Sequence, residues 1–140
     1  MLCGIDPLLR GELLHLLDDM GHSDTVVVAD GNFPAHRVAR HVVDVCCDSA
    51  PRVLEAIRTV LPLDTGRSVR LMSAGTEHLL DVQAELVAAA RCDEDTVELL
   101  ARQAFYEAAA QAYLVVRTNE TRPYGNALLA KGVVPAPVTA

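Results

Sequence analysis

Short valine-rich runs alternate along this chain with longer stretches of helical periodicity, and this alternation limits the possible folds more than any other feature. The segment 25–30 (TVVVAD) predicts a buried strand, because β-branched residues are favoured in sheets. Further strands are predicted at 37–46 (RVARHVVDVC), 68–74 (SVRLMSA) and 112–118 (AYLVVRT). Strands that alternate with helices indicate an α/β fold, in which helices flank a layered sheet.

Two helices are predicted in the first half of the chain. Apolar residues recur at helical spacing over 7–21, and Gly21 is expected to end that helix. In the segment 48–62, Ser49 is a candidate N-cap and Pro62 is expected to end the helix. Both helices therefore carry their own start or stop signals.

The second half of the chain is less uniform. The segment 81–91 predicts a helix that Asp81 caps. The segment 96–112 fits either one long helix or a strand followed by a helix from about Gln103. A polar loop at 119–126 (NETRPYGN) follows the last predicted strand.

The chain is expected to form one domain over residues 1–140, with a flexible tail at about 135–140. Its 140 residues and its 51% hydrophobic composition suit one globular core. The formal net charge of -7 argues against a nucleic-acid surface, which needs clustered lysine and arginine. No apolar run approaches the ~20 residues of a transmembrane helix, and no signal-peptide pattern opens the chain.

Four cysteines lack the CxxC spacing of redox or metal motifs. They are Cys3, Cys46, Cys47 and Cys92. Buried, reduced thiols are the favoured interpretation, which together with the missing targeting segment predicts a cytoplasmic protein.

Several common catalytic motifs are absent from the sequence. There is no GxGxxG or GxxxxGK[ST] for nucleotides, no GxSxG for hydrolases and no HExxH for zinc. The remaining candidates flank the strand at 25–30: His22 precedes it and Asp30 closes it. Ligands bind at the carboxyl ends of strands in open α/β sheets, so Asp30 and the loop at 119–126 are candidate walls of one pocket.

These residue types suit acid–base chemistry on a neutral polyol. A histidine exchanges protons near neutrality, and a carboxylate accepts hydrogen bonds from hydroxyl groups. Other interpretations stay open: His22 as an exposed residue after a helix, Asp30 as a turn cap, or a metal site of His22, Asp30 and His36.

Two separated motifs resemble the fucose mutarotase/ribose pyranase family. The segments are 20–36 (MGHSDTVVVADGNFPAH) and 102–134 (RQAFYEAAAQAYLVVRTNETRPYGNALLAKGVV). The resemblance extends over 8–134, although 44–92 matches in pattern alone. It implies an enzyme that interconverts the α and β anomers of L-fucose or a related sugar. Ribose pyranase activity, or a sugar-binding oligomer without turnover, is the alternative.

The resemblance also implies roles for individual residues. His22 matches the family's proton donor. The matching sugar-binding positions are Asp30, Arg102, Tyr124, Gly125 and Asn126. Arg102 and Gly125 are similar to the fucose branch, whereas Asn32, Gln103 and Ala108 depart from the family pattern and leave the exact sugar open.

Two further expectations concern cofactors and assembly. The resemblance implies that no cofactor and no metal is required. It also implies a ring-shaped homo-oligomer, typically a decamer, in which a neighbouring subunit completes each pocket.

Overall fold

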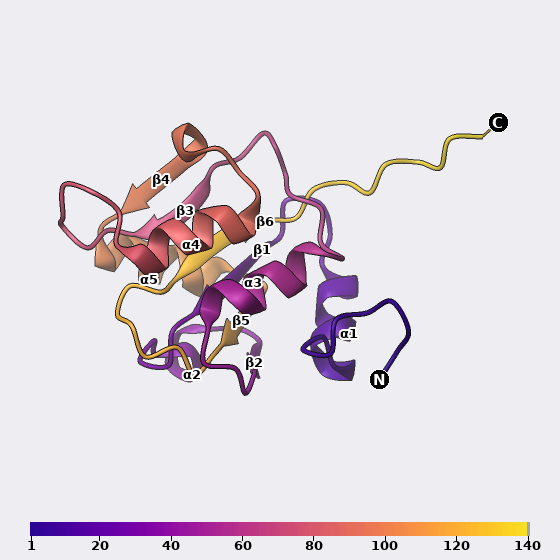
Figure 1. The fold of residues 1–140 in the computed structure, drawn as a ribbon, viewed down its shortest axis with the longest axis horizontal. Helices are drawn as coiled ribbons and strands as arrows, with labels where there is room; N and C mark the ends of the chain where they lie inside the picture. Colours follow the sequence, from indigo (N-terminus) through magenta and orange to yellow (C-terminus); the bar gives the residue numbers. More distant parts are fainter. Residues whose placement is uncertain (140) are drawn as a thin grey trace.

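A six-stranded sheet forms the centre of the computed structural model, which describes residues 1–139 (Figure 1). The strands are β1 (Thr25–Ala29), β2 (Val42–Asp44), β3 (Val69–Met72), β4 (Val97–Leu100), β5 (Leu114–Arg117) and β6 (Ala127–Ala130). Their order is β2-β5-β1-β6-β3-β4, and β6 runs antiparallel to both of its neighbours while the other pairs are parallel. The predicted α/β class with a layered sheet is confirmed.

Helices cover both faces of this sheet (Figure 1). They are α1 (Gly11–Asp19), α2 (Ala35–Val38), α3 (Ala50–Arg58), α4 (Asp81–Ala90) and α5 (Arg102–Gln111), with a 3-10 turn at Glu94–Thr96. Residues of α1, α3 and α4 pack in one core cluster, and residues of α2 and α5 pack in the other. The sheet therefore has three helices on one face and two on the other.

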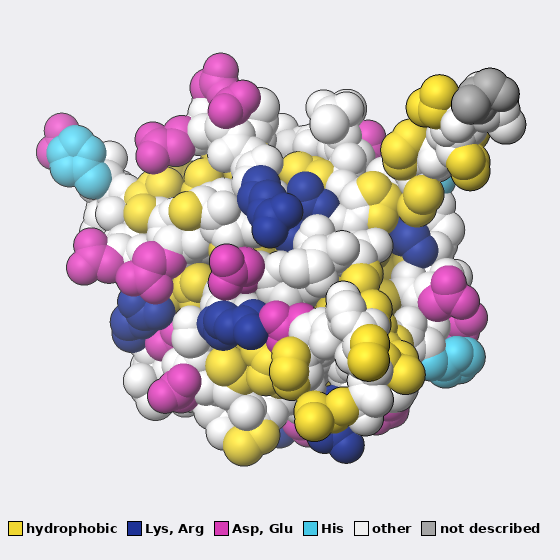
Figure 2. Space-filling model, turned by 45° about the vertical axis from the view of Figure 1, so that its right-hand side comes forward, with side chains coloured by type: hydrophobic (Ala, Val, Ile, Leu, Met, Phe, Trp, Pro, Cys, Tyr) yellow, Lys and Arg dark blue, Asp and Glu magenta, His cyan; other side chains and the backbone are white. Residues whose placement is uncertain are grey.

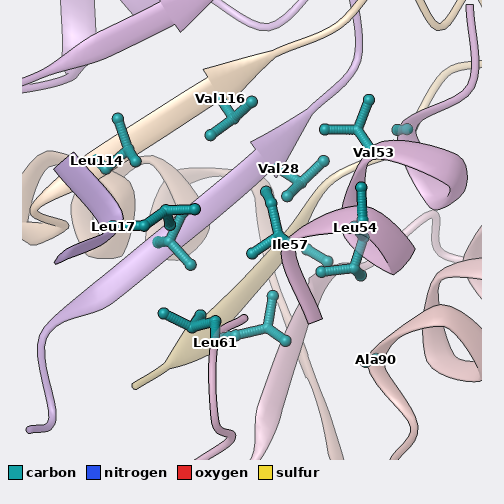
Figure 3. Packing of buried hydrophobic residues seen from close by; sticks show 14 of the residues in the cluster. Leu17, Val28, Val53, Leu54, Ile57, Leu61, Ala90, Leu114 and Val116 are labelled. Atoms are coloured by element: carbon teal, nitrogen blue, oxygen red, sulfur yellow. The ribbon is translucent and has the colours of Figure 1, made fainter. Parts of the chain in front are cut away.

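β1 is buried on both faces, which explains its continuous run of apolar residues. Val26 and Val28 point into the cluster under α3, and Val27 and Ala29 point toward α5. Figure 3 shows Val28 beside Ile57 of α3 in the larger cluster. Valine, leucine and alanine fill both cores, so β1 is a rigid central element that sets the positions of the loops at its two ends.

The strand predicted over 37–46 is much shorter than expected. Only Val42–Asp44 is extended, and the residues before it include the single helical turn of α2. That turn closes through a hydrogen bond from the Val38 N–H to the Pro34 carbonyl (3.1 Å), and it buries Ala35 against the α5 core. The strand β6 was not predicted at all.

The other helix predictions have mixed outcomes. The cap at Ser49 is confirmed, since its Oγ accepts a hydrogen bond from the Arg52 N–H at 3.2 Å. The cap at Asp81 is wrong: Leu80 is the N-cap, and its N–H donates to Gln83 Oε1 at 3.0 Å. Of the two alternatives for 96–112, the strand followed by a helix is confirmed.

The four thiols are free, but the prediction that they are buried is wrong. Cys3 and Cys46 are exposed, and Cys47 and Cys92 are half-buried. Cys47 and Cys92 pack against the larger core cluster from outside it, and Cys3 and Cys46 lie at the surface.

The segment after Gly132 leaves the body of the protein (Figure 1), and its valines are exposed. Hydrophobic side chains of this segment extend at the upper right of Figure 2. The flexible tail at 135–140 stays a prediction, and its last residue lies outside the described part of the chain. Basic and acidic side chains are interspersed on the face that Figure 2 shows. Among the described residues, no helix is long and apolar enough to cross a membrane.

Candidate functional site

A pocket of about 260 Å³ opens at the carboxyl ends of β1 and β3, beside the first turn of α5. Its lining residues are Asp30, Asn32, Phe33, Met72, Arg102, Tyr106, Pro123, Tyr124 and Asn126. At ~30 Å³ per water, this space equals roughly nine water molecules. It therefore suits a small polar molecule. The location is the one expected for ligands of an open α/β sheet.

Asp30 and Asn126 form the buried base of this pocket. Asn126 Oδ1 accepts a hydrogen bond from the Asp30 N–H at 2.9 Å, and Asn126 Nδ2 donates to Asp30 Oδ2 at 3.0 Å. The Asn32 N–H donates to the other carboxylate oxygen at 2.9 Å. Both side chains of the pair are almost fully buried within one chain. Two hydrogen bonds to the carboxylate and one from the Asp30 backbone therefore hold Asp30 in one orientation.

Burial raises the pKa of Asp30 above its ordinary value of 3.8. The hydrogen bonds from Asn32 and Asn126 act in the opposite direction and offset only part of that increase. Asp30 lines the pocket, and an ionised carboxylate is a strong acceptor for hydroxyl groups.

The loop after β1 is tied to the loop after β5. Both the N–H and the hydroxyl of Thr118 donate to the Ala29 carbonyl, at 3.0 and 2.9 Å. The Gly31 N–H donates to the Glu120 carbonyl at 2.9 Å. A Cβ at Gly31 would lie 3.3 Å from the carbonyl oxygens of Thr118 and Glu120, so this close approach favours glycine. The two candidate walls predicted from the sequence are one connected unit.

An ion pair between the buried Glu120 carboxylate and the partly exposed Arg122 fixes the far side of the same loop. Glu120 is 2% exposed, and its carboxylate accepts hydrogen bonds from Arg122 Nε (3.0 Å), Arg122 Nη2 (2.9 Å) and the Ala50 N–H (3.3 Å). Arg122 also contacts Glu85 of α4 through both terminal nitrogens, each at 2.9 Å. The guanidinium lowers the pKa of Glu120, and the two carboxylates raise the pKa of Arg122. The loop that carries Tyr124 is therefore anchored to α3 and α4.

Tyr124 and Arg102 form the outer rim of the pocket. Tyr124 has a φ of +64°, a left-handed conformation that is strained for a residue with a side chain. Arg102 Nη2 donates to the Tyr124 hydroxyl at 3.4 Å, a long contact at an exposed position. Two donor groups therefore face the space above Asp30.

Gly125 does not line the pocket. A Cβ at this position would lie 3.1 Å from Glu120 Cγ and 3.3 Å from a methyl group of Val82. Gly125 lets the loop pack closely on α4, and its predicted contact with a sugar stays a prediction.

His22 lies outside the pocket of its own chain. It precedes β1, whereas Asp30 follows it, and five strand residues at about 3.3 Å each separate the two ends by roughly 16 Å. Its side chain is 60% exposed, and Nε2 lies 3.4 Å from Asp64 Oδ2. The structure therefore brings together Asp30, Arg102, Tyr124 and Asn126, and it leaves His22 apart.

The alternative metal site is not assembled within one chain either. His36 Nε2 lies 3.0 Å from Asp44 Oδ2, while Asp30 is engaged with Asn126. Within residues 1–139, no group of three or more histidine, cysteine, aspartate or glutamate side chains is placed to hold a metal ion.

Five lining residues were not among the predicted site residues. They are Asn32, Phe33, Met72, Tyr106 and Pro123. The rings of Phe33 and Tyr106 meet edge to face, with centroids 5.5 Å apart, and give the pocket an apolar wall. Phe33 and Tyr106 lie inside the two motifs that carry the resemblance, so the motifs themselves were a usable signal. Met72 offered none, because a methionine at the end of a strand looks like any core residue.

A family model and several known proteins match nearly the whole chain. A model described as the RbsD / FucU transport protein family matches residues 3–134. An L-fucose mutarotase of Glaesserella parasuis serovar 5 (strain SH0165) is 39% identical over 96% of this chain and 97% of its own length. A fucose mutarotase of Danio rerio is also 39% identical, over 96% of this chain and 95% of its own.

A solved structure of a fucose mutarotase shares the fold over almost the whole of this chain. The fucose mutarotase from Streptococcus pneumoniae, crystallised in complex with L-fucose, is 31% identical, with a TM-score of 0.88. The match covers 96% of this chain and 100% of that one.

Proposed function

We propose that this chain, which belongs to the RbsD / FucU family, is a monosaccharide mutarotase. Its proposed reaction is the interconversion of the α and β anomers of L-fucose or a related sugar. The observation that carries the proposal is the pocket with the Asp30–Asn126 pair at its base and the donors of Arg102 and Tyr124 at its rim. The mutarotases named above support it, since they are similar to this chain over nearly its whole length.

The pocket provides complementary groups for a sugar. The Asp30 carboxylate accepts hydrogen bonds from sugar hydroxyls, and the Arg102 guanidinium donates to hydroxyl and ring oxygens. The apolar wall of Phe33 and Tyr106 suits the C–H face of a pyranose. As proposed, Asp30, Arg102, Tyr124 and Asn126 bind the substrate, and Gly125 gives their loop its shape.

Anomer exchange requires the ring to open and close again. A proton is delivered to the ring oxygen while the anomeric hydroxyl loses one to solvent water. The bond between the anomeric carbon and the ring oxygen then breaks, and a carbonyl forms. The carbonyl then rotates, and the ring closes on its other face as both proton transfers reverse. His22 is the proposed proton donor, since imidazole can give and take a proton near neutral pH. The step as proposed requires neither a cofactor nor a metal.

The position of His22 has a consequence for assembly. A proton donor must lie within hydrogen-bond reach of the sugar, and His22 lies at the opposite end of β1 from its own pocket. We therefore propose a homo-oligomer in which His22 of a neighbouring copy enters the pocket, and the family resemblance favours a ring, typically a decamer. Exposed apolar side chains at Leu99, Val133 and Val134 are compatible with contacts between copies. The four free thiols favour the cytoplasm as its location.

Saturation-transfer NMR between anomers tests the function directly. The protein should accelerate anomer exchange of L-fucose above the spontaneous rate, with D-ribose and D-galactose as comparison sugars. Sugar binding without acceleration would instead identify a sugar-binding oligomer. Acceleration that also connects the pyranose and furanose signals of D-ribose would identify a ribose pyranase.

A further inference from the structure

The C-terminal segment at 133–139 is apolar and extends away from the body of the protein (Figure 1). The Gly132 N–H donates to the Pro62 carbonyl at 2.8 Å and fixes the point where the segment begins. The side chains that follow are exposed, with 67% for Val133, 68% for Val134 and 98% for Val138. Valines exposed so close together indicate a contact with another surface.

The order of residues in this segment limits how it can pair. The stretch 134–138 (VPAPV) has proline at every second position. In an extended chain successive N–H groups point to opposite sides, and proline has no N–H. One side of the stretch therefore keeps the N–H groups of Val134, Ala136 and Val138, and the other side has none. Such a stretch can pair with a sheet along one side only, as an edge strand does.

The strand β2 offers an unpaired edge, because it lies at one end of the sheet. It pairs with β5 through alternate residues, and the Val115 N–H donates to the His41 carbonyl at 2.9 Å. Given the parallel register of the two strands, the backbone groups of Val42 and Asp44 point away from β5. These N–H and C=O groups form an edge to which an extended segment can add.

A groove of about 310 Å³ lies beside this edge, between β2 and the residues at the start of α1. Leu8, Leu13, Val43 and Val45 give it an apolar lining, and the exposed Cys46 also lines it. All side chains at 133–138 are apolar. Whichever direction the segment runs along β2, apolar side chains of the segment therefore face the groove.

We propose that the free edge of β2 and its groove bind the C-terminal segment of a second copy of this chain. The segment of the same chain is too short to reach them. In the sheet order β2 is three strands from β6, so a strand added beyond β2 lies four spacings, or ~19 Å, from β6. The four residues from 133 to 136 span at most ~14 Å, so Ala136 cannot lie along the β2 edge of its own chain.

This contact is too small to hold two copies together alone. A standard interface uses ~20–30 residues on each side, whereas the stretch 133–138 supplies six. Between copies already held in one assembly, a tethered segment has an effective concentration of about a millimolar, which makes a weak contact favourable. The segment therefore reinforces an assembly that other surfaces form. The inference goes beyond the sugar chemistry and requires only a second copy.

Cys46 allows a direct test, because it is an exposed native thiol in the groove. Val138→Cys places a second thiol on the segment, and Cys3→Ser removes the other exposed native thiol. Mild oxidation with copper–phenanthroline should join position 138 of one chain to Cys46 of another. Covalent dimers and longer ladders should appear, with the link mapped by peptide mass spectrometry. A link within one chain, or no link between these positions, would overturn the proposal.

The opposite edge strand, β4, provides the comparison. Leu99 is 48% exposed, so Leu99→Cys gives that edge an accessible thiol. In a chain with Cys46→Ser and Val138→Cys, linking at position 99 should be at least about tenfold slower than linking at Cys46, because only a docked thiol gains effective concentration. Equal rates would show that random collisions make the link, and a faster rate at position 99 would assign the segment to β4.

Ala136→Pro and Pro135→Ala form a matched pair that tests the backbone pairing. Ala136→Pro removes an N–H from the side that faces β2, whereas Pro135→Ala adds one to the other side. Ala136→Pro should slow linking to Cys46 by about two- to tenfold, the contribution of one net hydrogen bond, and Pro135→Ala should change it less than about twofold. If the two variants behave alike, the segment does not add as a strand and the proposal fails. All rates are measured without sugar, so failure of the proposed function leaves this result unaffected.

Discussion

Asn126 makes hydrogen bonds with both the backbone and the side chain of Asp30. The Asp30 N–H donates to Asn126 Oδ1 at 2.9 Å, and Asn126 Nδ2 donates to Asp30 Oδ2 at 3.0 Å. The two residues are 96 positions apart in the chain, and they meet because β6 lies beside β1 in the sheet. The orientation of the candidate sugar-binding carboxylate is therefore set by the residue that precedes β6, far along the sequence.

This contact gives the first prediction. Asn126→Asp places a second carboxylate against Asp30, and two such groups in a buried site cannot both be ionised without strong repulsion. Sugar affinity at neutral pH should fall by more than tenfold, and the free energy of unfolding should decrease by roughly 1–3 kcal/mol. Calorimetry with L-fucose and urea denaturation measure the two effects.

Asn119→Asp serves as the control for this prediction. Asn119 is exposed in the same loop, so adding a charge there tests the general effect of a further carboxylate. Its affinity and stability should be close to those of the wild type. If Asn126→Asp binds L-fucose as tightly as Asn119→Asp does, the Asn126 amide is not needed to hold Asp30 for sugar binding.

The second prediction follows from the raised pKa of Asp30. Burial is the main cause, so the folded protein favours the protonated carboxyl more than the unfolded chain does. Its contribution to stability is full below the ordinary value of 3.8 and is lost as the pH rises through the higher folded pKa. Sugar affinity should change in the opposite direction, because the ionised form is the better acceptor.

Calorimetry and urea denaturation from about pH 4 to about pH 7 can separate these two trends. Asp30→Asn should remove both, while weakening sugar binding over the whole range. A wild-type affinity that does not change with pH across this window would show that ionisation of Asp30 is not needed for binding.

Much of the sheet could be predicted because its signals are local. The valines of 26–28 and the cap at Ser49 affect the conformation of residues close to them in sequence. Patterns over a few residues were therefore sufficient to predict these two elements. β6 could not be predicted in this way, since Ala127–Ala130 contains only alanine and leucine, which favour helices. Its strand conformation comes from simultaneous pairing with β1 and β3.

Some residues of the candidate site could be predicted from local sequence signals, and others could not. Asp30 and the loop at 119–126 were predicted as pocket walls because each follows an expected strand. Arg102 came from the family resemblance, and its contact with Tyr124 depends on how α5 packs. The pairing of His22 with Asp64 joins residues with no shared local pattern, so it required the structure.

The third prediction concerns specificity. Arg102 is exposed on the pocket rim and reaches the Tyr124 hydroxyl at 3.4 Å. Its guanidinium offers a fixed fork of donors that an imidazole cannot reproduce. Arg102→His should therefore reduce exchange of L-fucose more than exchange of D-ribose, as saturation-transfer NMR with both sugars would measure. Equal losses for the two sugars would mean that Arg102 shapes the pocket without selecting the substrate.

The fourth prediction concerns the anchor of the Tyr124 loop. The Arg122 guanidinium lowers the pKa of Glu120 below its ordinary value of 4.5. The stabilisation that ionised Glu120 gives the folded protein is present above that value, and it is lost as the pH falls through the lower folded pKa. Glu120→Gln should lower the free energy of unfolding at neutral pH by roughly 1.5–3 kcal/mol. The free energy of unfolding of this variant should also change less as the pH falls.

Urea denaturation at several pH values checks this prediction, with Glu55→Gln on the exposed side of α3 as the control. That control should change the free energy of unfolding by no more than about 0.5 kcal/mol. If both variants lose stability equally, the Glu120–Arg122 pair does not act as an anchor.

The fifth prediction concerns His22 and the assembly together. His22→Ala should bring anomer exchange close to the spontaneous rate, because a general acid–base group typically contributes ~10²–10⁴-fold. Sugar binding should be largely retained, since the pocket of each chain keeps Asp30, Arg102 and Asn126. Asp30→Ala should also be inactive, but through loss of binding. Each variant keeps the group that the other lacks.

Co-assembly of the two inactive variants then tests whether one site uses two copies. If His22 of one copy enters the pocket of the next, random mixing in equal amounts restores roughly a quarter of the sites, because each needs an intact histidine and an intact pocket from different chains. Mixing His22→Ala with a chain that carries both substitutions should restore none. Hybrid rings that contain both single variants and remain at the spontaneous rate would show that His22 and Asp30 do not act in a shared site.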